Sequence, residues 1–188
     1  MKKALIKLII FPSLATIFLL TNSLNAQTVN INTSVPGPVN PVLNQFLTSA
    51  AVRSTLLYTR GGSFGDTASA YVWGRIERLT APTFVIEPNV SNLAITVRTG
   101  MQVTLTPLQI RQAFGNLSSL SVSGAGASNI NPSDVVLPDG LYRICFLANQ
   151  FQRCPPTPGG CNFSNFASGC GDFTVSCSPI NSAQINTL

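Results

Sequence analysis

One turn and the strand that follows it, in residues 137–148, constrain the fold of this chain more than any other segment. Their sequence is Leu-Pro-Asp-Gly-Leu-Tyr-Arg-Ile-Cys-Phe-Leu-Ala. Proline presets φ for a tight turn, the aspartate side chain bonds to its own backbone, and glycine adopts a positive φ without steric cost. A second strand is predicted at residues 171–177, after a cysteine-rich loop. The two segments predict the closing antiparallel hairpin of an all-β domain.

Tyr142 stands two residues after Gly140, at the start of the first of these strands. This arrangement resembles the tyrosine corner of immunoglobulin-like sandwiches, in which the phenol hydroxyl bonds back to the preceding turn. We therefore expect the fold to be an immunoglobulin-like β-sandwich.

The rest of the chain repeats an alternation of apolar and polar residues at period two, broken by turn residues at regular intervals. Further strands are predicted over residues 28–33, 51–59, 68–79, 83–87, 93–99 and 101–105. Residues 118–133 are rich in Ser, Gly, Ala and Asn, and are interpreted as a loop or a weak strand. The resulting seven to eight short strands are typical of a sandwich.

One short helix is predicted after the strand at 101–105. Thr106 is a suitable N-cap, Pro107 stands at the first helical position, and Gly115 ends the helix. Residues 42–49 could form a further short helical turn.

The N-terminal segment is predicted to be a signal peptide. It begins with Lys2, Lys3 and Lys7, continues through an apolar run over residues 5–20, and ends on the small residue Ala26. No transmembrane segment is expected after its removal. The expected division of the chain is a signal peptide at 1–26, a β-sandwich domain at 27–177 and a C-terminal tail at 178–188.

The charge of the mature chain argues against a nucleic-acid partner. The whole chain carries a formal charge of +5, but all three lysines lie in the predicted signal peptide. Eight arginines against six acids then leave +2, and the arginines are scattered rather than clustered. A nucleic-acid-binding surface would require a basic run or stripe.

All five cysteines lie in the last 44 residues of the chain. Clustered cysteines after an export signal favour disulfides. Without histidine only a four-thiolate zinc site is possible, and the cysteines lack the paired C-x2-C spacing of such sites. The preferred pairing joins Cys145 to Cys170 across the hairpin and Cys154 to Cys161 within the loop, which leaves Cys177 free. Spacing alone does not establish this connectivity.

The composition disfavours an enzyme. A chain without histidine has no Ser-His or Cys-His pair, and a mature chain without lysine has no Ser-Lys pair. Glu77 and Glu87 are interpreted as solvent-facing or ion-paired, and Asp139 as a turn residue. We predict no catalytic residue, no metal ligand and no cofactor.

Tyr71 and Trp73 lie on one face of the predicted strand at 68–79, with Arg75 beside them. They could form a sugar-stacking platform or anchor a protein interface. Alternatively, Trp73 is the core tryptophan that many sandwiches carry, and this second interpretation is the preferred one.

The loop at 149–169 is long for a hairpin, and long ordered loops often bind partners. Its Phe151, Arg153, Phe163 and Phe166 could form a contact surface. They could equally cover one end of the sandwich, and the sequence leaves both interpretations open.

The tripeptide Asp66-Thr67-Ala68 matches the O-glycosylation sequon of the Bacteroidota, and it falls in a predicted turn. Thr67 is therefore a candidate glycosylation site.

Five blocks of the chain carry a resemblance to a known family: Pro41–Leu47, Met101–Thr106, Leu137–Cys145, Ser168–Cys170 and Phe173–Val175. Together they resemble the TANFOR-type β-domains of Bacteroidota surface and secreted proteins. It implies a β-domain outside the cytoplasm, and it brings no enzymatic activity.

We expect an exported, non-enzymatic structural or protein-binding component of a cell-envelope or surface assembly for secretion, motility or adhesion. Its location would be the periplasm, the outer membrane or the cell surface, and its partner another envelope or surface protein. The alternative is a carbohydrate-binding module with a glycan as its partner.

The signal peptide yields a first prediction. Cleavage after Ala26 should give a mature protein that begins at Gln27, because charge, apolar run and small residue all place the cut there. Intact-mass measurement of the protein from the cell envelope checks this, and a protein that retains Met1 would contradict it.

Overall fold

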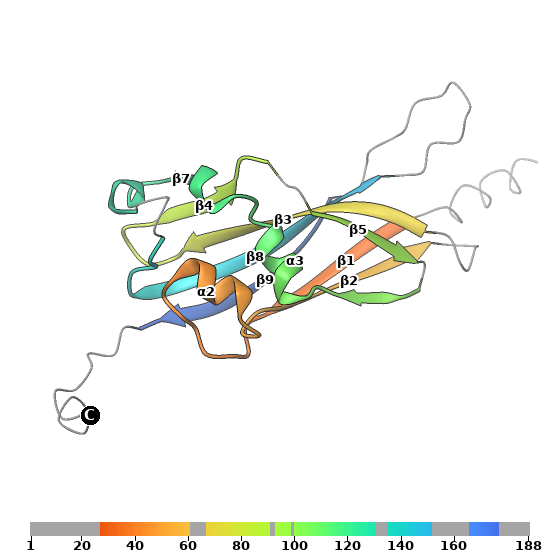
Figure 1. The fold of residues 1–188 in the computed structure, drawn as a ribbon, viewed down its shortest axis with the longest axis horizontal. Helices are drawn as coiled ribbons and strands as arrows, with labels where there is room; N and C mark the ends of the chain where they lie inside the picture. The colour runs from red at the N-terminus through yellow and green to blue at the C-terminus, as the bar shows by residue number, and fades with distance from the viewer. Residues whose placement is uncertain are drawn as a thin grey trace, which may run out of the picture.

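Two β-sheets face each other across one hydrophobic core (Figure 1). The computed structural model describes residues 27–60, 67–90, 93–98, 100–130, 135–151 and 166–176. The predicted all-β sandwich is confirmed. The predicted signal peptide and C-terminal tail lie outside the described residues, and their assignment stays a prediction.

The smaller sheet contains β1 (Gln27–Ser34), β2 (Arg53–Arg60) and β6 (Gln102–Thr104), all antiparallel in the order β1-β2-β6. Leu56 and Tyr58 of β2 are buried, as the alternation predicts. The buried hydroxyls of Thr33 and Ser54 lie opposite each other and form a hydrogen bond of 3.1 Å. Their polar groups are therefore satisfied inside the core.

The larger sheet has the order β7-β4-β3-β8-β9, and β5 pairs with β3 beside β4. Its strands are β3 (Thr67–Arg78), β4 (Phe84–Pro88), β5 (Leu93–Arg98), β7 (Leu120–Ser123), β8 (Gly140–Phe151) and β9 (Phe166–Val175). The segment interpreted as a loop or weak strand thus contains β7, which pairs with β4 at one edge of the sheet.

Two short α-helices, α2 (Leu43–Thr48) and α3 (Pro107–Gln112), lie against each other on the core side of the larger sheet (Figure 1). The predicted cap of α3 is confirmed: Thr106 and Gln109 form a reciprocal capping box, and Pro107 opens the helix. Just beyond α3, the Phe114 ring packs directly on Gly74 of β3. A Cβ at Gly74 would lie 2.2 Å from that ring, so the site requires glycine.

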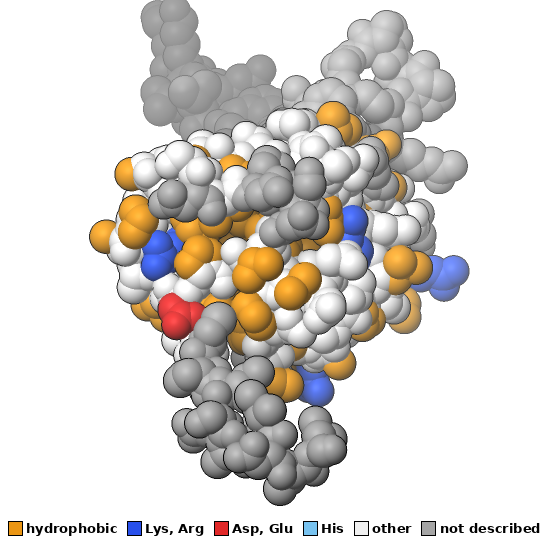
Figure 2. Space-filling view, turned by 60° about the vertical axis from the view of Figure 1, so that its left-hand side comes forward, with side chains coloured by type: hydrophobic (Ala, Val, Ile, Leu, Met, Phe, Trp, Pro, Cys, Tyr) orange, Lys and Arg blue, Asp and Glu red, His pale blue; other side chains and the backbone are white. Residues whose placement is uncertain are grey.

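Short 3-10 turns at Leu117–Ser119 and Ala127–Asn129 flank β7. Figure 2 brings the left-hand end of Figure 1 forward and shows hydrophobic side chains gathered across that end, between separate basic side chains.

The core is built by alternate residues of the central strands. Val72 and Ile76 of β3 and Ile144 and Phe146 of β8 are fully buried. Each large apolar side chain buried in this way contributes about 1.5–3 kcal/mol relative to exposure. These residues therefore decide which face of β3 and β8 turns inward.

The preferred interpretation of Trp73 as the core tryptophan is wrong. Trp73 is half-buried and lies on the opposite face from Val72, whose side chain is fully buried. Because side chains alternate along a strand, the buried Val72 and Ile76 force Trp73 outward.

The predicted tyrosine corner is present. The Tyr142 hydroxyl donates a hydrogen bond of 2.6 Å to the Pro138 carbonyl oxygen. Its ring stacks on Phe173 at a centroid distance of 5.4 Å and meets Phe84 edge-on at 6.0 Å. The turn is tied to β3 as well, because Arg78 Nη2 donates to the Asp139 carbonyl at 2.7 Å.

The final strand differs from its predicted span of 171–177. It begins at Phe166 and ends at Val175, and β8 extends to Phe151, so the loop between them is shorter than the predicted 149–169. Pairing of β8 with β9 continues in register on both sides of the disulfide cysteines. It runs from the pair Asn149 and Phe166 to the pair Gly140 and Val175. Sequence alternation alone does not reveal this because glycines interrupt the apolar pattern.

Those glycines allow the two sheets to meet. A Cβ on Gly169 would lie 2.3 Å from the Ile31 carbonyl oxygen, and one on Gly171 would lie 3.0 Å from the Ser34 Cα. The backbone of β9 thus approaches the backbone of β1 in the smaller sheet. Only residues without a side chain permit that distance.

The tyrosine corner yields a second prediction. Tyr142→Phe should lower the free energy of unfolding by about 1 kcal/mol, because it removes one hydrogen bond and keeps the ring contacts. Urea denaturation of the mature protein measures the loss. Tyr142→Leu, which also removes the stacking on Phe173, should cost clearly more. A Tyr142→Phe protein as stable as the wild type would show that the bond does not hold the turn.

Candidate functional site

The candidate functional surface is the side of β3, β8 and β9 that faces away from the core, here called the outer face. Its residues lie in rows that run across the three strands. From one end to the other the rows are Tyr71–Asn149–Phe166, Trp73–Leu147–Ser168, Arg75–Cys145–Cys170 and Glu77–Arg143–Asp172. The ladder thus brings an aromatic end, a disulfide and a charged end onto one surface.

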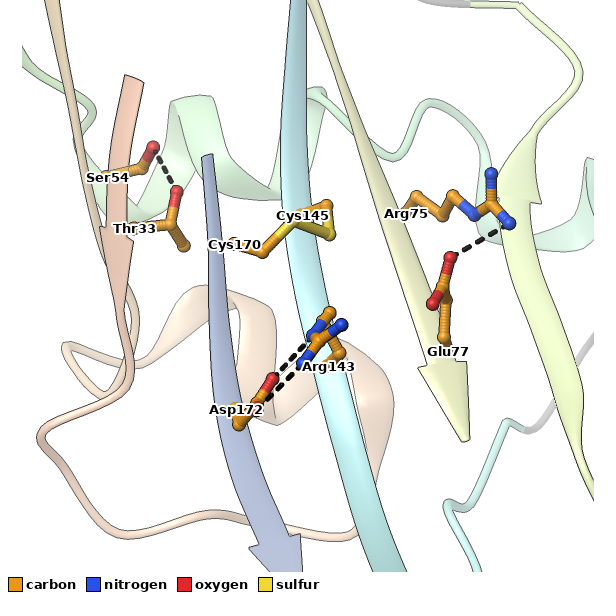
Figure 3. The surroundings of a disulfide bond; sticks show 8 residues. All are labelled: Thr33, Ser54, Arg75, Glu77, Arg143, Cys145, Cys170 and Asp172. Carbon is orange, nitrogen blue, oxygen red and sulfur yellow. Dashed lines mark hydrogen bonds and ion pairs between the residues drawn. A yellow bond between two sulfur atoms is a disulfide. The ribbon is translucent and has the colours of Figure 1, made fainter. Parts of the chain in front are cut away.

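The charged end contains two ion pairs (Figure 3). Arg143 donates to Asp172 through Nε at 2.7 Å and through a second nitrogen at 3.1 Å. Arg75 reaches Glu77 on its own strand at 2.8 Å. Glu77 is therefore ion-paired, as its sequence context predicts.

The forked contact between Arg143 and Asp172 also alters their protonation. The hydrogen bond from Arg143 lowers the pKa of the Asp172 carboxyl, and the same bond raises the pKa of Arg143. The pair consequently stabilises the fold above the ordinary pKa of an aspartate, and this contribution is lost as pH falls through the lowered value. Both side chains are exposed to water, so the pair mainly orients the charged end.

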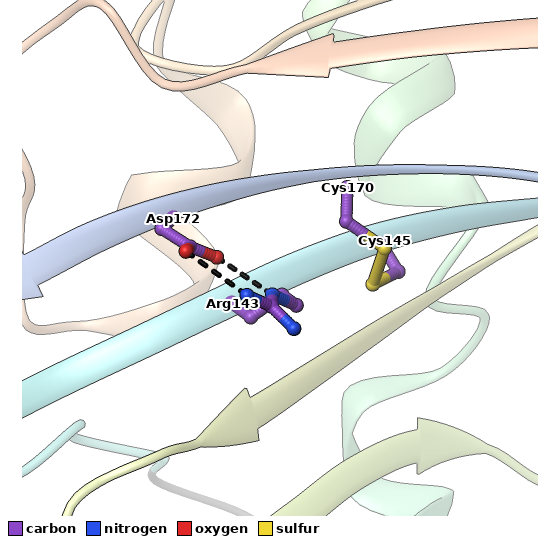
Figure 4. A network of polar contacts seen from close by, with 4 residues as sticks. All are labelled: Arg143, Cys145, Cys170 and Asp172. Carbon is purple, nitrogen blue, oxygen red and sulfur yellow. Dashed lines mark hydrogen bonds and ion pairs between the residues drawn. A yellow bond between two sulfur atoms is a disulfide. The ribbon is translucent and has the colours of Figure 1, made fainter.

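The predicted disulfide between Cys145 and Cys170 is present at the centre of the outer face (Figure 4). The two residues lie directly opposite each other, with a Cα–Cα distance of 4.1 Å. That separation is typical of the pairs in an antiparallel ladder that exchange no backbone hydrogen bonds, where side chains approach most closely. Cys145 is only 8% exposed, whereas Cys170 is exposed to solvent.

The other cysteines lie outside the described residues. The pairing of Cys154 with Cys161 and the free thiol at Cys177 therefore stay predictions.

The aromatic end holds the strand residues proposed for binding. Tyr71 is 43% exposed, and Trp73 is half-buried opposite Leu147. Leu147 and Asn149 were not among the predicted site residues. The signal that points to them is the set of odd-numbered residues on β8, which shares the outward face with Tyr71 and Trp73 once β8 is placed beside β3.

The predicted loop residues are partly located. The backbones of Phe151 and Phe166 belong to β8 and β9, and they pair with Ser69 and Asn149. Both ends of the loop thus start beside Tyr71. Arg153 and Phe163 lie outside the described residues, and so do the side chains of Phe151 and Phe166.

Thr67 is the first residue of β3, paired with Arg98, and so does not lie in the predicted turn. Its glycosylation stays a prediction, since its side chain is outside the described part of the chain.

Several of the described acids have partners within the fold. Glu77 and Asp172 are ion-paired, and the Asp139 carbonyl accepts from Arg78 in the turn. Within the described ranges, no group of three acids or cysteines is placed to hold a metal ion. In the same part of the chain, every helix is too short or too polar to cross a membrane.

Comparisons of the chain with protein-family models, with curated proteins and with solved structures found no match. The outer face must therefore be interpreted from its own geometry.

The disulfide yields a third prediction. Replacing both Cys145 and Cys170 by serine should lower the free energy of unfolding by roughly 3 kcal/mol, because the bond closes a loop with a sequence separation of 25. Guanidinium denaturation of the double variant against the wild type measures this.

Peptide mapping without reductant provides the control for that prediction. It should recover Cys145 linked to Cys170, and a peptide in which Cys145 is linked to Cys177 would contradict the register of β8 and β9 described above.

Proposed function

We propose that this protein is an exported, non-enzymatic binding component of a bacterial cell-envelope or surface assembly, and that it docks a protein partner through the outer face. The observation that carries the proposal is the aromatic end, where Tyr71, Trp73 and Leu147 lie together on a sheet braced by a disulfide. Aromatic side chains with a half-buried body are the usual anchors of protein interfaces. A braced sheet presents them with little loss of conformational entropy on binding.

The surroundings of these side chains support a protein partner. Trp73 and Leu147 supply an apolar centre, while Arg75, Glu77 and Arg143 supply charged groups at one side. An apolar centre with a polar margin is the common anatomy of a protein interface. The charged groups would set orientation, and the apolar residues would provide affinity.

Export is supported by two independent features. The N-terminal residues have the pattern of a signal peptide, and the Cys145–Cys170 disulfide belongs in an oxidising compartment. The resemblance to TANFOR-type domains agrees with a place in the envelope or on the surface. We propose the periplasm, the outer membrane or the cell surface as its location.

The proposal of a non-enzyme is supported by composition. The chain has no histidine, and its lysines all lie before residue 8. The described ion pairs engage Glu77 and Asp172 with arginines, which supports a structural rather than a catalytic role for both acids.

A carbohydrate-binding module is the second candidate. Tyr71 and Trp73 stand two residues apart on the same strand face, so their rings belong to one surface. Such a pair could stack on a sugar ring. The test below separates the two candidates.

The proposed interface yields a fourth prediction. A photoreactive amino acid at position 71 should cross-link to one dominant envelope protein in living cells, because that side chain lies at the edge of the apolar centre. The same amino acid at Met101 is the matched control, since Met101 is 55% exposed and lies next to β6 of the other sheet. Trp73→Ala should weaken affinity for the captured protein by at least about tenfold.

The outcomes discriminate between the candidates. Glycan-array binding that is lost in Trp73→Ala, with no protein cross-linked at position 71, would replace the proposal with the carbohydrate-binding module. Equal cross-linking from positions 71 and 101 would overturn the outer face as the binding surface.

A further inference from the structure

A groove of about 530 Å³ lies beside the two helices, away from the outer face. Its wall is formed by the start of α2, by Arg111 of α3, by Leu117 of the following 3-10 turn, and by the extended segment before the Pro-Asp-Gly turn. The lining residues are Val42, Leu43, Asn44, Arg111, Leu117, Val135 and Val136. This volume falls within the range of about 300–1,000 Å³ that small-molecule sites occupy in proteins.

The groove belongs to the core side of the larger sheet. The residues that follow α3 rest on Gly74, whose position points inward, while Trp73 and Arg75 point to the outer face. The groove and the outer face are thus two different surfaces. The ligand proposal for the groove and the partner proposal for the outer face can therefore be tested independently.

The exposed apolar part of the wall comes from Val42, Leu117 and Val136, because Leu43 and Val135 are buried. Val42 and Val136 form an isolated β-bridge, and the Leu43 amide donates to the Val135 carbonyl at 2.9 Å. Val136 is nevertheless 51% exposed, so one side of the groove presents an apolar surface to solvent. The backbone bonds fix the start of α2 beside residues 135 and 136.

Arg111 is the one charged side chain among the described lining residues. It donates from Nε to Asn44 Oδ1 at 2.9 Å and from Nη1 to the Gly115 carbonyl oxygen. Both acceptors are neutral, and burial lowers the pKa of Arg111. Its positive charge is therefore positioned by two hydrogen bonds but is neutralised by no carboxylate within the described structure.

Donors remain beside this charge. The bonds of Arg111 leave its Nη2 group without a partner among the described residues. Asn44 uses its Oδ1 to accept from Arg111 Nε. Asn44 Nδ2 is consequently a second donor next to the guanidinium. A carboxylate accepts such adjacent N–H groups in a forked geometry, and this charge-assisted pairing is stronger than a neutral hydrogen bond.

We propose that this groove binds a small apolar monocarboxylic acid, with its carboxylate on Arg111 and Asn44 and its hydrocarbon part between Val42, Leu117 and Val136. The charge selects an anion, because a cation would be repelled and a neutral apolar molecule would bury Arg111 without compensation. The apolar wall selects a ligand with a hydrocarbon body rather than an inorganic anion. Because Arg111 is the one cation among the described lining residues, the expected ligand carries one carboxylate.

Octanoate is the probe, and isothermal titration of the full mature protein is the measurement. Octanoate should bind saturably, and 1-octanol, which has the same chain without the charge, should bind at least about tenfold more weakly. Arg111→Gln should weaken octanoate binding by a similar factor. Arg98→Gln removes the same charge from an exposed position on β5 and is the matched control, with binding unchanged.

A second variant protects the test against misfolding, because Arg111 also links α3 to α2. Val136→Glu adds an anion to the wall at an exposed position, so the fold should persist while octanoate is repelled. Loss of binding in both Arg111→Gln and Val136→Glu, with Arg98→Gln unchanged, supports the proposal. Equal binding of octanoate and octanol, unchanged binding in Val136→Glu, or no saturable binding of octanoate would overturn it.

Discussion

The antiparallel ladder of β3, β8 and β9 is the interaction on which the rest of this structure depends. Because side chains alternate along each strand, one register decides both which residues fill the core and which form the outer face. A slip of one residue would turn Ile144 and Phe146 to solvent and bring Arg143 and Cys145 inside. Two contacts oppose such a slip: Tyr142 bonds to the turn at Pro138 at one end, and Cys145 joins Cys170 along the ladder.

The segment Gly169-Cys170-Gly171 serves both faces of β9 at once. Its glycines point inward, where the β1 backbone lies too close for any side chain, and its cysteine points outward to the disulfide. Contact between the sheets and bracing of the outer face are therefore coupled within three residues. A surface held in this way should change little on binding, which suits the proposed interface at Tyr71 and Trp73.

Local features of the fold were predictable from sequence because they depend on residues only a few positions apart. The tyrosine corner needs Pro138 and Tyr142 within one turn, and the cap of α3 needs Thr106 and Gln109 within another. The Cys145–Cys170 pairing was predictable for a related reason, since a hairpin brings its two strands together. Trp73 was misassigned because a general preference for a core tryptophan was placed above the alternation of its own strand, which already put Val72 and Ile76 on the other face.

The sequence by itself determined the turn, the helix cap and the alternating faces of β3, since each follows from spacing along the chain. It favoured the Cys145–Cys170 pairing without establishing it. Only the tertiary structure decided the neighbours across the sheets. Tyr71 lies beside Asn149, 78 positions later in the chain, because β3 pairs with β8, and Arg111 meets Asn44 because α2 and α3 pack together. Such contacts depend on the order of strands in the sheet and on the packing of helices over it. Many orders are compatible with one pattern of alternation, and the packing of the whole core selects among them.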